Sequence, residues 1–311
     1  MNYDNRIITV GFMNIKGQTK LSTEKQRQIE DFVKLYKLDI LNMQEIEICD
    51  DTFAECNLIS TSYNIISNNS DNGYGTACLV KSNLDFSNVK CDTSGRAIFF
   101  NVGSTSFGNL YAHSGTVNIS RQNRENFFSE TVPNLLINSG SSGCIGGDLN
   151  SIVEKEDATN YPVSKMSKSF QKLSKTFNWQ DSFRSLHPLV QQFSHYYSNS
   201  RAEGATRIDR GYHYGDISIL KAFYEPLAFS DHHALVLHMR LPSSFSRLKC
   251  PPADYSFRIK AEVVTDNIFR MRLKEAMVEW QKIRSFGLDI LVWWESIVNP
   301  GIKKLAQHRN E

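Results

Sequence analysis

The apolar residues of this chain fall into short runs separated by turn signals, and amphipathic stretches lie between some of these runs. Short apolar runs are typical of buried strands. We expect strands at residues 7–15, 39–44, 63–68, 75–81, 97–102, 107–112, 143–147, 192–197, 205–214, 218–224 and 233–240. Helical spacing occurs at residues 22–38, 121–138 and 165–177, with Ser22 as an N-cap and Pro133 as a helix breaker. Strands that occur both as hairpins and with helical crossovers predict an α/β or α+β fold with mixed sheets and external helices.

The pattern changes after residue 242. Residues 243–264 are polar and include Pro251 and Pro252, a composition that is typical of a linker. Residues 265–283 and 289–307 again show helical spacing, and the second stretch carries an apolar stripe. We therefore expect one large domain at residues 1–242, a linker at 243–264 and a helical segment at 265–311.

Composition narrows the classes of protein only slightly. The hydrophobic content of 41% and charged content of 22% are ordinary for a globular protein, and the net charge of +2 neither requires nor excludes a nucleic-acid partner. The six cysteines form no Cys-x-x-Cys pair, so we expect no cysteine zinc site but free, partly buried thiols. Residues 1–6 do not lead into a signal peptide, and no apolar stretch approaches the ~18 residues of a membrane span. These features predict an intracellular protein without a membrane partner.

Polar residues with metal-binding and phosphate-binding chemistry follow several of the apolar runs directly. A polar residue at the end of a buried strand lies at the rim of its sheet. We therefore expect these residues to share one metal and phosphate site. They are Asn14, Glu45, Asp148, Asn150, Asp209, Ser230, Asp231 and His232.

The residue types suggest a division of roles within that site. Mg²⁺ prefers hard oxygen ligands and keeps several waters, so Glu45 is the expected ligand, with Glu47 as its nearest competitor. Asp231 is expected to be a second metal ligand or an acceptor beside it, and Mn²⁺ is an alternative cation. Asp148, which follows two glycines, is expected to orient or deprotonate a water molecule, while Asn150 holds Asp148 or a phosphate oxygen.

Asp209 and His232 form a candidate carboxylate–histidine pair. A carboxylate on one imidazole nitrogen fixes the tautomer and favours the imidazolium, so the other nitrogen can meet a phosphate. His233 is the competing histidine, but its position on the following strand suggests that it points to the opposite side.

Taken in order, these motifs resemble the endonuclease–exonuclease–phosphatase superfamily. The series is Asn14, Gln44-Glu45, Tyr111, Gly147-Asp148-Leu149-Asn150, Arg207-Ile208-Asp209 and Ser230-Asp231-His232. The branch most similar to this chain is the apurinic-like endonuclease of LINE-type non-LTR retrotransposons. Any one motif is weak, but the ordered series is specific. The resemblance implies a four-layer α/β sandwich, in which two packed mixed sheets are flanked by helices, with a C-terminal helical extension.

The same resemblance implies a Mg²⁺-dependent endonuclease that nicks double-stranded DNA and leaves 3′-hydroxyl and 5′-phosphate ends. In LINE-type elements the 3′-hydroxyl primes reverse transcription, which implies a nuclear setting and a reverse transcriptase domain downstream in a longer chain. Residues 265–311, which carry no polymerase motif, would then connect the two domains, and the alternative is an independent helical hairpin. By the same resemblance, the Tyr111 hydroxyl reaches the scissile phosphate, Asn14 contacts phosphate or metal-bound water, and Ser230 bonds backbone or carboxylate.

Four further residues are expected to touch the substrate. Residues 198–206 resemble the hairpin that relatives press into the DNA minor groove, and Arg201 and Arg207 flank it. The alternative is a plain polar loop. His113 stands where the family has proline, and His195 where many relatives have threonine, so both departures bear on substrate preference.

Two alternative functions remain open at this point. The chain could be an abasic-site repair endonuclease or another phosphoesterase of the same superfamily, because a fold does not settle the substrate. It could also be a catalytically inactive nucleic-acid-binding module. The presence of all the acidic, amide and imidazole residues of the motif series favours an enzyme.

Overall fold

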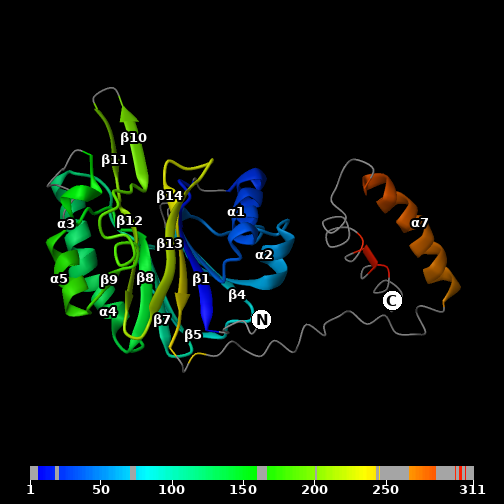
Figure 1. Ribbon diagram of the computed structural model, residues 1–311, viewed down its shortest axis with the longest axis horizontal. Helices are drawn as coiled ribbons and strands as arrows, with labels where there is room; N and C mark the ends of the chain where they lie inside the picture. Colours follow the sequence, from blue (N-terminus) through cyan, green and yellow to red (C-terminus); the bar gives the residue numbers. More distant parts are fainter. Residues whose placement is uncertain are drawn as a thin grey trace. The chain divides into compact units, whose positions relative to one another are not determined.

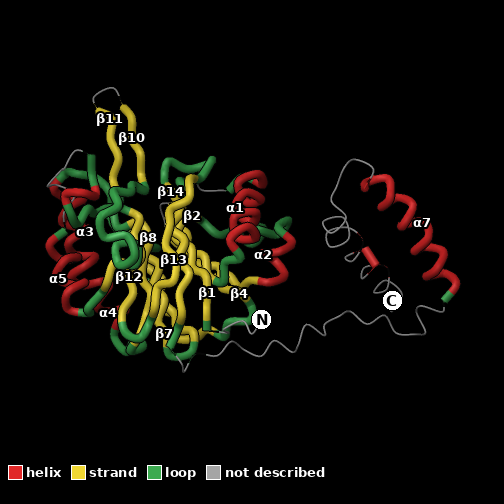
Figure 2. The backbone as a smooth tube through the Cα atoms, viewed as in Figure 1, coloured by secondary structure: helices red, strands yellow, loops and turns green. Residues whose placement is uncertain are grey.

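The computed structural model describes residues 6–17, 21–70, 75–159, 167–199, 202–242, 245, 266–284, 298, 301–302 and 305. The chain forms two compact units, Met1–Leu248 and Lys249–Glu311. In the first unit, two six-stranded mixed sheets pack face to face with helices on both outer faces, as predicted (Figure 1). The sandwich arrangement of strands between helices is also clear in Figure 2.

The first sheet contains the strand pair that positions Asn14 and Glu45. Its order is β13 (Ser218–Pro226), β14 (His233–Arg240), β1 (Ile7–Asn14), β2 (Ile40–Ile46), β4 (Gly75–Lys81) and β3 (Tyr63–Asn68). Only β1 and β2 run parallel, and α1 (Thr23–Tyr36) connects them. The Ser22 hydroxyl accepts a hydrogen bond from the Lys25 amide, which confirms the expected N-cap. The apolar face of α1 and the short helix α2 (Asn57–Ser62) cover the outer face of this sheet.

The second sheet supplies the remaining strand ends. Its order is β5 (Phe86–Cys91), β6 (Ala97–Val102), β7 (Thr105–Tyr111), β8 (Ser142–Asp148), β12 (Asp209–Tyr214) and β9 (Gln180–Asp181). β7 and β8 run parallel, whereas β12 runs antiparallel to β8. In this register Asp148 is paired with Tyr111 on one side and with Asp209 on the other. The end of two strands and the start of a third therefore meet at one rim.

Helices cover the outer face of the second sheet. They are α3 (Asn118–Asn126), the π-helix η1 (Phe127–Thr131), α4 (Val132–Leu136) and α5 (Lys168–Thr176), with the 3-10 turn η2 (Lys155–Asp157) nearby in the chain. The expected break at Pro133 is wrong. Pro133 lies in the first turn of α4, where a missing N–H is tolerated, and the wider π turn leads into it.

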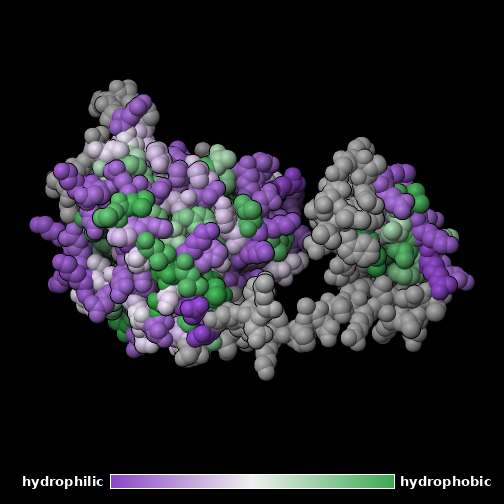
Figure 3. Space-filling model, viewed as in Figure 1, coloured by the Kyte–Doolittle hydropathy of each residue, from purple (hydrophilic) through white to green (hydrophobic). Residues whose placement is uncertain are grey.

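The core between the sheets explains the apolar runs. Residues on the inner faces of both sheets pack together, among them Phe12, Leu235, Phe100, Phe107 and Cys144. Burial of both faces of the central strands accounts for their nearly continuous apolar character, because each sheet also packs against helices. The viewed surface of this unit is a mixture of polar side chains and smaller apolar patches (Figure 3).

Some expected elements differ from the structure. The single strand expected at residues 205–214 is wrong, since β11 (Ala202–Thr206) and β12 are separated by Arg207 and Ile208. β11 pairs with β10 (His195–Asn199) in a separate ribbon that projects beyond the sheets (Figure 1). The elements α2, β5 and β9 were not expected. Most of β5 is exposed, so its sequence lacks the apolar run of a buried strand.

The C-terminal part is described only in places. α7 (Asn267–Arg284) corresponds to the first expected helix, and most of the second, at residues 289–307, lies outside the described residues. Of the expected linker at residues 243–264, only Phe245 is described, and it is buried in the core of the first unit. The first unit therefore extends past residue 242. Within the described parts of the chain, no helix is both long enough and apolar enough to cross a bilayer.

Candidate active site

The strand ends of both sheets surround a polar cavity of about 360 Å³. Seven of the ten lining residues carry a charged, amide or imidazole side chain. The lining residues are Lys16, Glu45, Ser114, Gly115, Asp148, Asn150, His195, Ile208, Asp231 and His232. Tyr111, Asn14 and Asp209 bond directly to members of this set. The structure thus brings together most of the residues that the sequence suggested.

Asp209 and His232 form a buried pair. The Nδ1 atom of His232 lies 2.8 and 3.0 Å from the two carboxylate oxygens of Asp209. The Ser194 hydroxyl holds Asp209 in place by donating to Oδ2 over 2.7 Å and accepting from the Asp209 amide. Burial lowers the pKa of His232, but the charge and hydrogen bond of Asp209 outweigh burial and raise this pKa to about 9. His232 is therefore an imidazolium at neutral pH, and its Nε2 is the nitrogen available to the cavity.

Asp148 is fixed by amide donors. Its Oδ2 accepts from the side chains of Asn14 and Asn150 at 3.0 and 3.1 Å, and its Oδ1 accepts from the Asn150 backbone amide at 2.9 Å. Burial and then repulsion from Asp209 raise the pKa of Asp148 to about 7. A carboxylate with a pKa near neutrality is suited to take a proton from a nucleophile.

The backbone before and after Asp148 has unusual torsions. Gly147 has φ +132°, and a Cβ atom there would lie 2.1 Å from the Leu110 carbonyl oxygen, so the position requires glycine. Asn150 has φ 45°, in the left-handed region that asparagine adopts more readily than most residues. These torsions turn the chain sharply at the sheet rim and direct both polar side chains towards the cavity.

A β-bulge directs Glu45 into the site. The register between β2 and β4 shifts between Gln44 and Ile46, and Glu45 has φ 57°. Its Oε1 accepts from the Tyr111 hydroxyl at 2.9 Å and from the Asn14 amide at 3.2 Å. Burial, followed by the charge of Glu45, raises the pKa of Tyr111, so the phenol stays protonated and donates. Left-handed torsion at a non-glycine residue is strained and recurs at functional sites.

Glu45 fits a hard divalent cation. Its carboxylate lines the cavity and receives only neutral donors on Oε1, and no hydrogen bond to Oε2 comes from the described residues. Oxygen ligands and room for several waters suit Mg²⁺ and Mn²⁺.

The surroundings of Asp231 differ from those expected of a residue that binds a metal ion together with Glu45. Lys16 Nζ donates to its Oδ2 over 2.7 Å, and His195 Nε2 lies 3.9 Å from the same oxygen. Burial favours the neutral carboxyl, but the Lys16 hydrogen bond and the His232 charge outweigh it and lower the pKa of Asp231. Asp231 is therefore held by cationic partners.

Sequence reasoning missed Lys16 and Ser194. Lys16 follows Asn14 by two residues in the loop after β1, and Ser194 directly precedes His195. Their closeness in the sequence to Asn14 and His195 was the only local feature of the sequence that pointed to them. The pairing of Lys16 with Asp231 spans 215 positions, which no local pattern reveals.

Two of the four expected substrate contacts, Arg207 and His113, do not lie in the cavity. The expectation for Arg207 is wrong, because its side chain is 1% exposed and forms ion pairs with Asp157 at 2.9 Å and Asp181 at 2.8 Å. Ser230 donates to the Asn14 carbonyl and accepts from the His232 amide, which is the backbone bonding expected for it, and it is not among the residues that line the cavity. His113 lines a different cavity.

The environment of His113 differs from that of the active-site histidines. Its ring contacts Phe127 edge-on, and burial followed by the charge of Arg96 lowers its pKa to about 4. His113 is therefore held neutral and lies outside the cavity that Glu45, Asp148 and His232 line. His195 does line the main cavity, and its ring centre lies 4.5 Å from that of His232. Arg201 lies outside the described residues.

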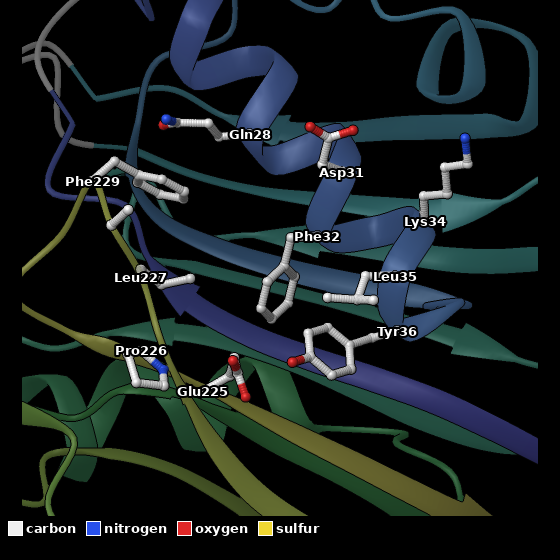
Figure 4. Close-up of a pocket in the computed structure, with 11 residues that line it drawn as sticks. Gln28, Asp31, Phe32, Lys34, Leu35, Tyr36, Glu225, Pro226, Leu227 and Phe229 are labelled. Carbon is white, nitrogen blue, oxygen red and sulfur yellow. The ribbon is translucent and has the colours of Figure 1, made fainter. Parts of the chain in front are cut away.

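A second, larger hollow of about 570 Å³ lies between α1 and residues 225–229 (Figure 4). Its walls are mainly apolar and include Phe32, Leu35, Leu227 and Phe229. It lacks the combination of buried carboxylates and imidazole that the smaller cavity holds. The smaller, polar cavity is therefore the candidate active site.

Comparisons with known proteins agree with the fold. No protein-family model matches the chain, and no curated protein sequence matches it. Among solved structures, the AP endonuclease LMAP from Leishmania major superposes with a TM-score of 0.62 at 18% identity over 76% of this chain and 89% of that one. An AP endonuclease from Archaeoglobus fulgidus gives 0.61 at 17% identity over 74% and 98%.

A third structure contains DNA. The 3′ phosphatase NExo from Neisseria, bound to a product DNA hairpin, superposes with a TM-score of 0.61 at 16% identity over 74% of this chain and 98% of that one. At these identities the likeness establishes a shared fold.

Proposed function

We propose that this chain is a nuclease of the endonuclease–exonuclease–phosphatase superfamily that uses Mg²⁺ or Mn²⁺ to hydrolyse a phosphodiester in double-stranded DNA. The observation that carries the proposal is that the Asp209–His232 pair, the buried Asp148 and the carboxylate of Glu45 converge on one cavity. The shared fold with two AP endonucleases and with a DNA-bound 3′ phosphatase supports DNA as the substrate class.

Each side chain has a role that follows from its contacts. Asp148 orients a water molecule and takes its proton as the water oxygen attacks phosphorus. His232, held by Asp209, donates from Nε2 to a phosphoryl oxygen whose negative charge grows in the transition state. A divalent cation held by Glu45 would neutralise charge on the phosphate and the leaving oxygen.

The remaining neutral donors maintain this geometry. Asn14 bridges Glu45 and Asp148, and Asn150 fixes Asp148 from the other side. The bond between phosphorus and the 3′ oxygen breaks, and that oxygen takes a proton from solvent. The products are a 3′-hydroxyl and a 5′-phosphate.

We further propose that the natural role is target-site nicking by a LINE-type retrotransposon in the nucleus, where the 3′-hydroxyl primes reverse transcription. The ordered motif series and the C-terminal segment resembling a LINE connector support this role, and a reverse transcriptase domain would follow in a longer chain. The second candidate is abasic-site cleavage, which the likeness to two AP endonucleases favours.

One experiment separates these functions. Supercoiled plasmid and a duplex with one abasic site are incubated with the full chain, with Mg²⁺ or with EDTA, and the ends are mapped. Mg²⁺-dependent nicks in intact DNA whose 3′ ends a polymerase extends support the retroelement role. Cleavage confined to the abasic duplex supports repair. Binding without cleavage of either DNA supports the inactive binding module.

We expect Glu45→Gln to raise the Mg²⁺ concentration needed for half-maximal nicking. The amide keeps the size of the side chain but loses the negative charge that a hard cation prefers. The measurement is a Mg²⁺ titration of plasmid nicking, and Glu47→Gln is the matched control. If only Glu47→Gln raised the Mg²⁺ concentration needed, Glu47 and not Glu45 would be the metal ligand.

We expect a bell-shaped pH dependence of the nicking rate at low DNA concentration. The rate should rise as Asp148 loses its proton, through a pKa of about 7, and fall as His232 loses its own through a pKa of about 9. A cation held by Glu45 would favour the Asp148 carboxylate and would move the acidic limb to lower pH. A rate that increases steadily through the alkaline range would exclude the imidazolium as the donor.

A further inference from the structure

A second group of candidate metal ligands lies in the active-site cavity beside the Asp209–His232 pair. One ligand atom from each of His195, Asp231 and His232 lies within 4.8 Å of the others. His195 Nε2 is 3.9 Å from Asp231 Oδ2, and the two imidazole rings have centres 4.5 Å apart. All three residues line the cavity, so a small ion can reach them from solvent.

The chemistry of this group differs from that at Glu45. Two imidazoles and one carboxylate suit Zn²⁺, Co²⁺, Ni²⁺ or Cu²⁺, whereas Mg²⁺ prefers oxygen ligands alone. The group includes no cysteine, so the absence of a Cys-x-x-Cys pair has no bearing on it. Three protein ligands leave a fourth tetrahedral position for water.

His232 is already oriented as a metal-ligating histidine. Asp209 engages Nδ1 at 2.8 Å and is itself held by the Ser194 hydroxyl. A carboxylate on one imidazole nitrogen fixes the tautomer and makes the other nitrogen a better ligand, as in carboxylate–histidine–zinc arrangements. The nitrogen that would coordinate the metal is therefore Nε2, on the cavity side.

We propose that His195, Asp231 and His232 bind a transition-metal cation of the Zn²⁺ class, and that this cation inhibits hydrolysis. On coordination the metal replaces the proton on His232 Nε2, which passes to solvent, and the imidazole can no longer donate to the phosphate. The binding site stands on the geometry of the three residues alone. The inhibition rests on the proposed function, in which His232 is a donor.

The proposal also predicts that Lys16 weakens metal binding at this site, whereas His195 strengthens it. Its ammonium bonds Asp231 Oδ2 at 2.7 Å and so competes with a cation for that carboxylate. The Lys16 side chain is 60% exposed, so a bound metal can displace it into solvent. Removing the ammonium should therefore strengthen metal binding, whereas removing the His195 imidazole should weaken it.

The test is a Co²⁺ titration of the full chain without Mg²⁺, monitored by visible absorption. Zn²⁺ is then added to displace the bound Co²⁺. We expect one strongly absorbing, tetrahedral Co²⁺ per chain. His195→Gln should weaken Co²⁺ binding by at least about 10-fold. Loss of a residue that only hydrogen-bonds to a metal ligand already costs about 10-fold or more in metal affinity, and His195 is proposed to be a ligand itself. Lys16→Met should tighten binding, and His238→Gln, on β14, should leave it unchanged.

Several outcomes would overturn the proposal. They are the absence of a tetrahedral Co²⁺ signal in the unchanged protein, equal affinity in His195→Gln, or weaker binding in Lys16→Met. If circular dichroism shows that His195→Gln is misfolded, Asp231→Asn replaces it, with the same expected loss of affinity.

Plasmid nicking at fixed Mg²⁺ with added Zn²⁺ then tests inhibition. We expect Zn²⁺ to inhibit the unchanged protein at the concentration that displaces Co²⁺. Unchanged nicking with Zn²⁺ bound would overturn the inhibitory role. A protein that binds Co²⁺ but nicks no DNA under any condition would refute the proposed function and leave the metal site standing.

Discussion

Asp148→Asn is expected to lower the rate of plasmid nicking by about 100- to 10,000-fold, the range that a positioned proton-transfer group contributes. Asparagine keeps the size of the side chain, and its one oxygen can still accept from the Asn14 and Asn150 side chains. Its amide nitrogen cannot accept from the Asn150 backbone amide as Oδ1 does, and it cannot accept the proton of the attacking water. The measurement is the single-turnover rate at saturating Mg²⁺, with circular dichroism to show that the fold is intact. Asp216→Asn, at an exposed position, is the control and should retain full activity.

His232→Gln should have a comparable effect for a different reason. Loss of one preorganised donor to a developing oxyanion costs about 10²–10³ in rate. His233→Gln is the matched control, because its ring lies tilted against that of Tyr196, with ring centres 4.9 Å apart, and does not line the cavity. If His233→Gln lowered the nicking rate as much as His232→Gln, the assignment of His232 as the phosphate donor would be contradicted.

The sequence predicts the fold class because the central strands are buried on both faces. Their apolar runs and the positions of polar residues at their ends can be read directly, as at Asn14 and Asp148. Exposed elements such as β5 leave no such run, so they were missed. The fold class is confirmed, including the two packed sheets.

The detailed geometry of the site depends on pairings that a local pattern does not encode. The antiparallel register that sets Asp209 opposite Asp148 joins residues about sixty positions apart. The bulge that turns Glu45 inward arises from the pairing of β2 with β4. The same limit explains Lys16, whose partner Asp231 lies on a distant loop.

For Arg207 the sequence suggested a site contact that the structure does not show. Its place beside a predicted hairpin suggested a DNA contact, since an arginine in a polar loop is usually exposed. The structure instead buries it against Asp157 and Asp181, which come from two other segments. A buried arginine needs partners for its charge and its N–H donors. For Arg207 those partners are two carboxylates from distant segments, so they can be identified only from the folded structure.

This buried ion network leads to the largest expected effect on stability. The Asp157 carboxylate is fully buried and contacts Arg207 Nε at 2.9 Å, Arg184 Nη2 at 3.2 Å and Arg210 Nη2. Asp181 Oδ2 forms ion pairs with both Arg207 and Arg210. Asp209 lies between those two arginines in the chain, so the network holds the strand start that positions the catalytic pair.

Asp157→Asn is expected to lower the free energy of unfolding by about 3–5 kcal/mol, the typical cost of removing one partner from a buried ion pair. Burial alone would raise the pKa of Asp157, but Arg210 and Arg207 outweigh burial and lower it. Because the folded pKa lies below the unfolded value, this stabilisation is present above the unfolded pKa and is lost as pH falls through the folded one. Urea unfolding at neutral pH measures the change, with the exposed Asp85→Asn as control. An unchanged urea midpoint in Asp157→Asn would show that the network does not stabilise the fold.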